Sequence, residues 1–124
     1  MKTLECFTSK SCGPCRTMKR DLAAWQRPAD VDFRLVSIDE EEGARLAACR
    51  GAVGLPTVVL LIDGVPTAAV TGWIPGNPAE VLADLEKLAA DPTERAAFDG
   101  MLIEAAGEVE ARERSAAKQK RSRK

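Results

Sequence analysis

Two cysteines separated by two residues, Cys12 and Cys15, are the side chains best placed to do chemistry in this chain. They stand where an apolar run over residues 3–8 gives way to a helix-like pattern that begins near Gly13. The free backbone N–H groups at a helix start stabilise a thiolate in the first turn, and the thiolate is the reactive form of cysteine. A second cysteine nearly one turn further on lies beneath the first and can attack a mixed disulfide formed on it. The spacing therefore indicates dithiol–disulfide exchange.

The same pair of thiols could instead belong to a metal site. A zinc site needs about four ligands, and the chain contains no histidine and two further cysteines, Cys6 and Cys49. Cys6 falls on the predicted strand before the pair and Cys49 lies far along the chain, so redox chemistry is favoured. Both are expected to pack as small apolar side chains. The alternatives are a modulating role beneath Cys15 for Cys6 and regulatory oxidation for Cys49.

Length and charge limit the class of protein. The 124 residues suffice for one domain with an ordinary core. The net charge is −1, but residues 115–124 hold five basic and no acidic side chains, so residues 1–114 carry −6. No run approaches the length of a membrane span, and no secretory apolar segment follows the first residues. We therefore expect a cytoplasmic protein without membrane contact, in which four cysteines indicate redox or metal chemistry rather than structural disulfides.

Hydrophobic periodicity predicts an alternation of strands and helices around the cysteine pair. Apolar residues at three- and four-residue steps predict helices over residues 13–26 and 41–50. Runs of β-branched and aromatic residues predict strands over residues 3–8, 33–38, 57–62 and 66–71. Asp63-Gly64 is typical of a hairpin turn between the last two strands. The order predicts an α/β protein with a mixed four-stranded sheet whose first two strands are parallel.

Two helix starts with the same signature follow, at Asn77-Pro78 and at Asp91-Pro92. The first opens the helix that completes the main domain, which we expect over residues 1–90. The second opens an appended helix over residues 91–114. Its apolar stripe, residues 98–109, is expected to pack back on the domain, and a dimer or partner face is the alternative.

Residues 115–124 have no apolar pattern and are expected to form a basic, disordered tail. Its positive charge would allow contact with nucleic acid or with an acidic partner. The tail is short and lacks aromatic residues, so a solvated tail without a partner is the favoured interpretation and nucleic acid the less favoured one.

In its organisation and motifs the chain resembles the thioredoxin family, in a short form that begins at the strand before the active site. The resemblance covers roughly Leu4 to Leu88 and rests on four motifs. They are Cys12-Gly13-Pro14-Cys15, Ile38-Asp39 after the second strand, Gly54-Leu55-Pro56-Thr57, and Gly72 after the hairpin. The resemblance implies the thioredoxin fold, with the order β-α-β-α-β-β-α, here followed by an additional C-terminal helix and a basic tail.

The resemblance also implies roles for the site residues. Cys12 is then the nucleophile and Cys15 the resolving thiol. Pro56 follows a cis peptide bond and faces the disulfide, and the backbone of Leu55 is free to pair with an extended substrate segment. Trp73 either walls the substrate groove or anchors its loop. The substrate-binding residues implied in this way are Gly13, Pro14, Leu55, Pro56 and Trp73.

The chain departs from the family beneath the active site. The family's buried acid falls on Cys6 and the lysine that accompanies it falls on Leu35. Losing both together is physically consistent, because losing one would leave an unpaired charge. Cys15 then lacks its usual proton acceptor, and water, the substrate's leaving thiolate or Cys6 would have to serve. In addition, Ser11 stands where a tryptophan commonly precedes the first active cysteine.

Two functions follow from this interpretation. The first is a cytoplasmic thiol–disulfide oxidoreductase that reduces disulfide-containing proteins through Cys12 and Cys15. It would need no bound cofactor or metal, and a thioredoxin reductase or a glutathione-linked reductant would regenerate it. The second is an interaction or processivity module whose C-terminal helix and basic tail bind a partner.

Overall fold

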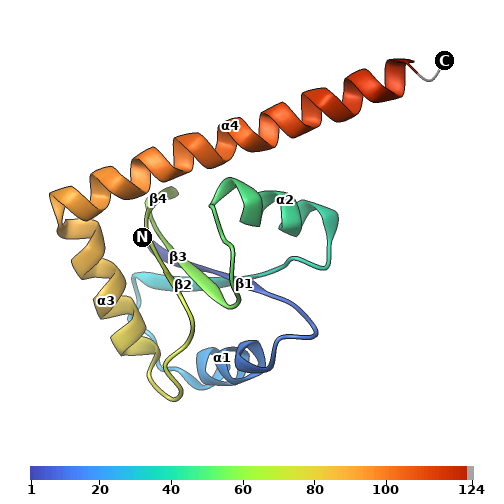
Figure 1. Ribbon diagram of the computed structural model, residues 1–124. Helices are drawn as coiled ribbons and strands as arrows, with labels where there is room; N and C mark the ends of the chain where they lie inside the picture. Colours follow the sequence, from blue (N-terminus) through green and yellow to red (C-terminus); the bar gives the residue numbers. More distant parts are fainter. Residues whose placement is uncertain (123–124) are drawn as a thin grey trace.

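The computed structural model describes residues 1–122, and within them four helices cover the two faces of one four-stranded sheet (Figure 1). The strands are β1 (Lys2–Thr8), β2 (Val31–Ser37), β3 (Thr57–Ile62) and β4 (Val65–Thr71). The helices are α1 (Gly13–Ala24), α2 (Glu41–Cys49), α3 (Pro78–Ala90) and α4 (Pro92–Ser122). The strand order is β2-β1-β3-β4, with β1 parallel to β2 and both other pairs antiparallel. The predicted mixed α/β sheet with its parallel first pair is confirmed.

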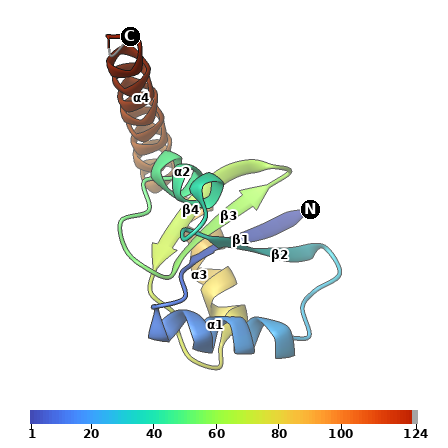
Figure 2. The same ribbon diagram turned by 90° about the vertical axis from the view of Figure 1, so that its right-hand side faces the viewer.

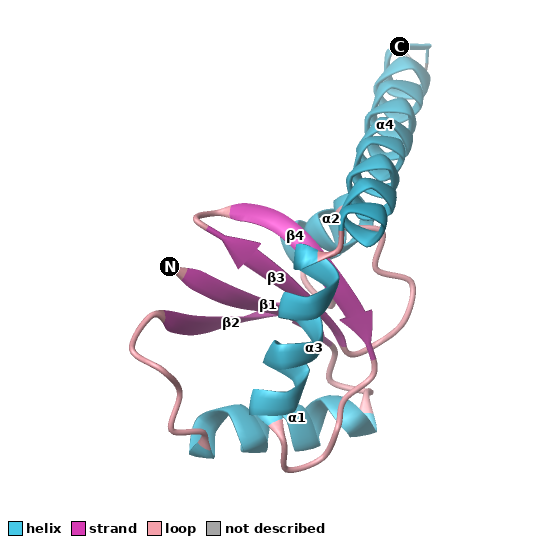
Figure 3. Ribbon diagram, turned by 90° about the vertical axis from the view of Figure 1, so that its left-hand side faces the viewer, coloured by secondary structure: helices cyan, strands magenta, loops and turns pink. Residues whose placement is uncertain are grey.

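Side chains of β1 alternate between two apolar cores because successive residues of a strand point to opposite faces of the sheet. Helices α1 and α3 cover one face, and α2 and α4 lie over the other (Figures 2 and 3). The first core contains Leu4, Cys6, Met18, Leu22, Val58, Leu60 and Leu85. The second contains Phe7, Ala47, Val59 and Leu61, with Leu55 and Phe98 packed against it. β1, which leads into the turn that carries Cys12, therefore lies between two packed layers.

Capping side chains explain where the last two helices begin. The Asn77 side chain accepts a hydrogen bond from the backbone N–H of Glu80 at 3.2 Å. The Asp91 carboxylate accepts from the N–H groups of Thr93 and Glu94 at 2.9 and 3.2 Å. Each cap thus satisfies backbone donors that have no partner inside the helix. The chain turns at Asp91, which separates α3 from α4 as the repeated signature predicts.

The first part of α4 packs on the domain through the predicted stripe, across α2 and β4 (Figure 1). Ala105 and Val109 are buried, while Phe98, Met101 and Leu102 are half-buried. Beyond them, Arg45 of α2 donates two hydrogen bonds to the Glu113 carboxylate, both at 2.9 Å. Helix α4 therefore adds a helical layer on the α2 face of the sheet.

Helix α4 continues further than the sequence analysis predicts. Instead of ending at residue 114 it extends to Ser122, with every side chain of residues 111–122 exposed. Residues 115–122 are thus solvated, as predicted, but helical rather than disordered, while residues 123–124 of the predicted tail lie outside the described residues. Alanine, lysine, glutamine and arginine dominate this segment and are strong helix formers. In residues 1–122 no helix has both the length and the apolar character to cross a membrane.

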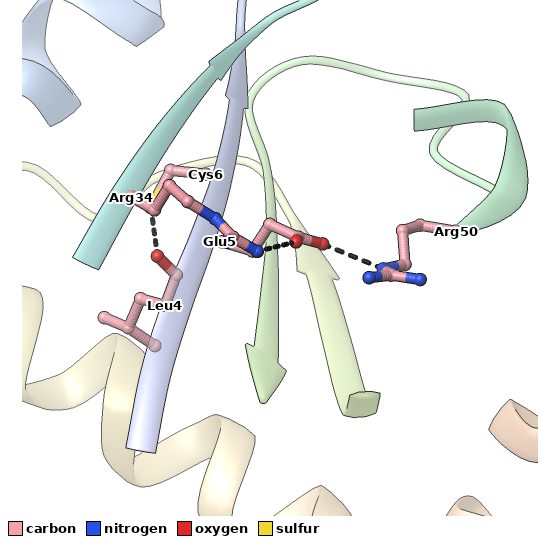
Figure 4. A network of polar contacts seen from close by, with 5 residues as sticks. All are labelled: Leu4, Glu5, Cys6, Arg34 and Arg50. Carbon is pink, nitrogen blue, oxygen red and sulfur yellow. Dashed lines mark hydrogen bonds and ion pairs between the residues drawn. The ribbon is translucent and has the colours of Figure 1, made fainter. Parts of the chain in front are cut away.

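A buried carboxylate, Glu5, links three elements on the α2 face of the sheet (Figure 4). Its side chain is 0% exposed and accepts hydrogen bonds from Arg34 of β2 at 2.6 Å and from Arg50, which follows α2, at 2.8 Å. A buried charge is tolerated only when it is paired in this way. The two arginines remain partly in solvent, at 56% and 20% exposure. Glu5 therefore holds β1, β2 and the end of α2 together.

Removing this charge should destabilise the fold measurably. We expect Glu5→Gln to lower the free energy of unfolding by roughly 2–3 kcal/mol, somewhat less than the roughly 3–5 kcal/mol typical of breaking a buried pair, because both arginines can turn to solvent. Urea denaturation would measure the change. The control is Lys2→Gln, which breaks the half-exposed pair with Glu86 and should have an effect of at most about 1 kcal/mol. Equal effects of the two substitutions would contradict a structural role for Glu5.

Candidate active site

The turn between β1 and α1 places Cys12 at the start of α1. Cys12 is the N-cap residue, with φ −89° and ψ 110°, and its sulfur accepts a hydrogen bond from the backbone N–H of Cys15 at 3.2 Å. Pro14 occupies the first turn, where a missing N–H leaves no carbonyl unpaired. The helix start therefore supplies the donor that stabilises a Cys12 thiolate.

Cys12 and Cys15 are joined by a disulfide, with their Cα atoms 5.3 Å apart. Cys12 is partly exposed and Cys15 is 0% exposed, with Gly13 and Pro14 exposed between them. An outside thiol or disulfide can thus reach the first sulfur, whereas the second is reached through the first. This asymmetry suits an exchange in which Cys12 reacts with the partner and Cys15 releases it.

The loop between α2 and β3 carries the second predicted part of the site. The Leu55–Pro56 peptide bond is cis, which confirms the prediction for Pro56. The carbonyl of Pro56 accepts a hydrogen bond from the N–H of Gly72 at 2.8 Å, and the Thr57 hydroxyl donates to the carbonyl of Gly54 at 2.6 Å. The loop before β3 is therefore joined to the loop after β4. That Pro56 faces the disulfide stays a prediction.

Trp73 is held against α1 by a polar contact. Its indole Nε1 donates to Asp21 Oδ2 at 2.9 Å, and the backbone N–H of Gly76 donates to the same oxygen at 2.7 Å. The hydrogen bonds from Trp73 and then Gly76 hold the pKa of the Asp21 carboxyl below its usual range. The half-buried indole also packs on the first core. This arrangement favours the loop-anchor interpretation of Trp73, and its contact with a substrate stays a prediction.

Cys6 lies in the core on the α1 side of β1, in the same cluster as Met18. Its thiol is fully buried and donates weakly to the carbonyl of Leu4 at 3.6 Å. Burial raises the pKa of the Cys6 thiol to about 12, and the nearby Glu5 charge adds to the rise. A thiol that is protonated at neutral pH has no site for a further proton, so Cys6 is a poor base for Cys15.

The other residues considered for the site lie apart from the disulfide chemistry. Cys49 is a half-buried free thiol at the end of α2. Leu35 of β2 pairs in register with Cys6 of β1 and is 44% exposed. A lysine at position 35 would therefore not be a buried charge. Throughout residues 1–122, no three His, Cys, Asp or Glu side chains form a group that could hold a metal.

Asp21 is the site residue that sequence reasoning missed. The available signal was a lone acid in a helix whose other charged positions, Arg16, Lys19 and Arg20, are all basic. Its partner Trp73 lies 52 residues away along the chain, and no local pattern links two positions at that separation. The contact became visible only with the fold.

Comparison with known proteins gives consistent results. A protein-family model described as Thioredoxin matches residues 2–86 and so leaves α4 outside the match. The chain is 40% identical over 52 residues to NADPH-dependent thioredoxin reductase 3 of Arabidopsis thaliana, covering 42% of this chain and 10% of that protein. It is 29% identical over 58 residues to thioredoxin of Acetoanaerobium sticklandii, covering 47% and 55%. The chain thus spans a tenth and about half of the lengths of these relatives.

Among solved structures, the oxidized form of mitochondrial thioredoxin 3 from Saccharomyces cerevisiae has a similar fold. The TM-score is 0.55 at 28% sequence identity, and the match covers 69% of this chain and 77% of that one. The similarity therefore extends over about two thirds of this chain.

The high pKa of Cys6 leads to a prediction about proton transfer. Cys6→Ala should leave the pH dependence of the Cys15 attack unchanged, because a protonated thiol accepts no proton. Cys6→Asp should shift that dependence, because a buried carboxylate with a raised pKa can accept the Cys15 proton. The rate is measured between about pH 6 and 9 by loading Cys12 with thionitrobenzoate and recording its release. A Cys6→Ala profile displaced from that of the wild type would show that Cys6 takes part.

Proposed function

The chain belongs to the thioredoxin family, and from this premise we propose that it is a thiol–disulfide oxidoreductase that reduces protein disulfides. The observation that carries the proposal is the Cys12–Cys15 disulfide, with a partly exposed sulfur at a helix start and a buried sulfur behind it. The pair follows the central strand β1 and lies at the start of α1. The two cysteines together carry two electrons, so one cycle reduces one substrate disulfide.

The reaction proceeds in two exchanges. In the first, the Cys12 thiolate attacks one sulfur of the substrate disulfide, forming a mixed disulfide while the other substrate sulfur leaves as a thiolate. In the second, Cys15 gives its proton to water or to that leaving thiolate and attacks the Cys12 sulfur. The Cys12–Cys15 disulfide forms, and the second substrate thiol departs. The N–H of Cys15, 3.2 Å from the Cys12 sulfur, supports the proposal that Cys12 is the nucleophile.

The substrate would bind around the disulfide as an extended segment. We place Gly13 and Pro14 in this surface because both are exposed between the cysteines. Leu55, Pro56 and Trp73 would complete it from the two loops that the Pro56–Gly72 hydrogen bond joins. We propose disulfide-containing proteins as the substrates, because the family likeness implies that the backbone of Leu55 pairs with an extended protein segment.

Regeneration requires a second dithiol or thiol reductant that supplies two electrons. We propose a thioredoxin reductase in this role, supported by the similarity to part of a protein named NADPH-dependent thioredoxin reductase. A glutathione-linked reductant is the alternative. The compartment that fits a reducing dithiol is the cytoplasm, where thiols are kept reduced. The dithiol carries the electrons itself, so the proposal requires no bound cofactor.

Serine substitutions test the proposed roles separately. Cys12→Ser should abolish insulin reduction, because the hydroxyl forms no mixed disulfide. Cys15→Ser should still attack but stall, so that a covalent complex with the substrate accumulates on non-reducing gels. Cys49→Ser, which alters a free thiol on α2, is the control and should reduce insulin at the wild-type rate. Insulin reduction by Cys12→Ser would contradict the proposal.

We also propose that the exposed end of α4 binds nucleic acid. It extends away from the body of the molecule (Figure 1), and residues 112–122 carry five basic side chains and one acid, Glu113. That acid is paired to Arg45, whose hydrogen bonds hold the pKa of Glu113 below its usual range. Arg114, Lys118 and Arg121 follow at four- and three-residue steps and so share one helix face. The segment has no apolar side chain larger than alanine, which favours phosphates over a membrane surface.

Salt dependence tests this second proposal. Three phosphate contacts predict a roughly 40-fold loss of affinity for double-stranded DNA between about 50 and 200 mM salt. Fluorescence anisotropy measures it, and the triple variant R114Q/K118Q/R121Q should bind more weakly while it still reduces insulin. The control variant Glu104→Gln/Glu108→Gln changes acids on the same helix and should not weaken binding. Absence of DNA binding at the lower salt would contradict the proposal, and an acidic protein would then be the remaining type of partner.

A further inference from the structure

The loop between α2 and β3, residues 51–55, is held at several points. Arg50, at its start, donates to the buried Glu5 carboxylate at 2.8 Å. Gly51 has a φ of 67°, in the left-handed region that ends helices, and the N–H of Ala52 donates to the carbonyl of Ala47 at 2.9 Å. The loop then reaches Leu55, whose side chain packs on the second core. Its path therefore depends on what lies against α2.

Helix α2 alone gives this loop little apolar support. It is nine residues long and rich in alanine. Between α2 and the loop lies a hollow of about 210 Å³, lined mainly by small side chains such as Ala44, Ala48 and Ala52. A hollow offers no atoms on one side, so the loop gains few dispersion contacts there. Another element has to restrict its position.

Helix α4 supplies a contact at the start of the loop. The sulfur of Met101 lies so close to Gly51 that a Cβ at that position would collide with it. One turn earlier on α4, Phe98 packs on the same core cluster as Leu55. The paired hydrogen bonds from Arg45 to Glu113 fix the far end of this contact to α2. Met101 of α4 thus meets the loop at its beginning, and Phe98 packs on the core cluster that also holds Leu55 at its end.

We infer that α4, which lies outside the family match, positions the substrate-binding loop and that Met101 is the positioning residue. The inference rests on the proposed function, because it assumes that the backbone of Leu55 pairs with the protein substrate. Met101 is not proposed to contact the Cys12 and Cys15 sulfurs or the substrate. It limits the positions that Gly51 and the following residues adopt, and so keeps the loop ready to bind an extended segment.

A comparison of two substrates separates positioning from chemistry. Insulin, a protein disulfide, requires the loop, whereas the small disulfide 5,5′-dithiobis(2-nitrobenzoate) needs only an accessible Cys12. We expect Met101→Ala to raise KM for insulin roughly fivefold, with kcat within about twofold. Without the Met101 side chain the loop adopts more positions, and ordering it upon binding costs free energy. The rate with the small disulfide should stay unchanged. Met101→Leu, which keeps most of the volume, should restore the insulin KM.

The matched control is Ile103→Ala on the same helix, where the side chain is 77% exposed and touches no core. It should change neither substrate. The inference is overturned if Met101→Ala equals Ile103→Ala with insulin, or if both substrates slow in proportion, which would indicate a general loss of structure. If Met101→Ala does not fold, Met101→Val takes its place in the same comparison. Failure of the proposed function itself is distinct, because the wild-type protein would then reduce neither substrate.

Discussion

The constraint on which the structure depends is that β1 is covered on both faces and leads into the turn that carries Cys12. Its even-numbered side chains, Leu4 and Cys6, enter the core under α1 and α3. Phe7 enters the core under α2 and α4, and Glu5 lies on that same face with its two arginines. A strand fixed from both sides has little freedom at its end, so the turn that follows delivers Cys12 to the start of α1 in one position.

The alternation of side chains along β1 also explains why the neighbouring residues Glu5 and Cys6 have different surroundings. The buried acid of this chain is at position 5 and the thiol at position 6, so the charge faces α2 while the apolar side chain faces the active-site helix. A shift of one residue along a strand exchanges the two faces. The carboxylate therefore stabilises the sheet and the end of α2, while position 6, on the α1 face, carries a thiol whose pKa is raised by burial. In the proposed reaction, Cys15 therefore gives its proton to solvent or to the substrate rather than to Cys6.

Short-range patterns predicted most of the fold. The strand and helix order, the Asp63-Gly64 hairpin and the caps at Asn77 and Asp91 are each determined within a few residues, and the structure contains all of them. The cis bond before Pro56 followed from the family motif rather than from propensity. The sequence did not predict the contacts between distant segments, which are those of Glu5 with Arg50, Asp21 with Trp73, and Met101 with Gly51. The helix over residues 115–122 was not predicted for a different reason. The lack of an apolar stripe suggests disorder, but it removes only packing and leaves the helix propensity of the residues unchanged.

Helix α4 is continuous from Pro92 to Ser122, and at 1.5 Å per residue its 31 residues form a rod of about 46 Å. The contact with Gly51 lies near one end of this rod and the cationic side chains lie near the other. A rod without a hinge transmits a tilt along its whole length, so a load on the outer end acts as a lever on the inner one. Binding at the outer end, as proposed, would therefore act through the same helix on the contact with Gly51.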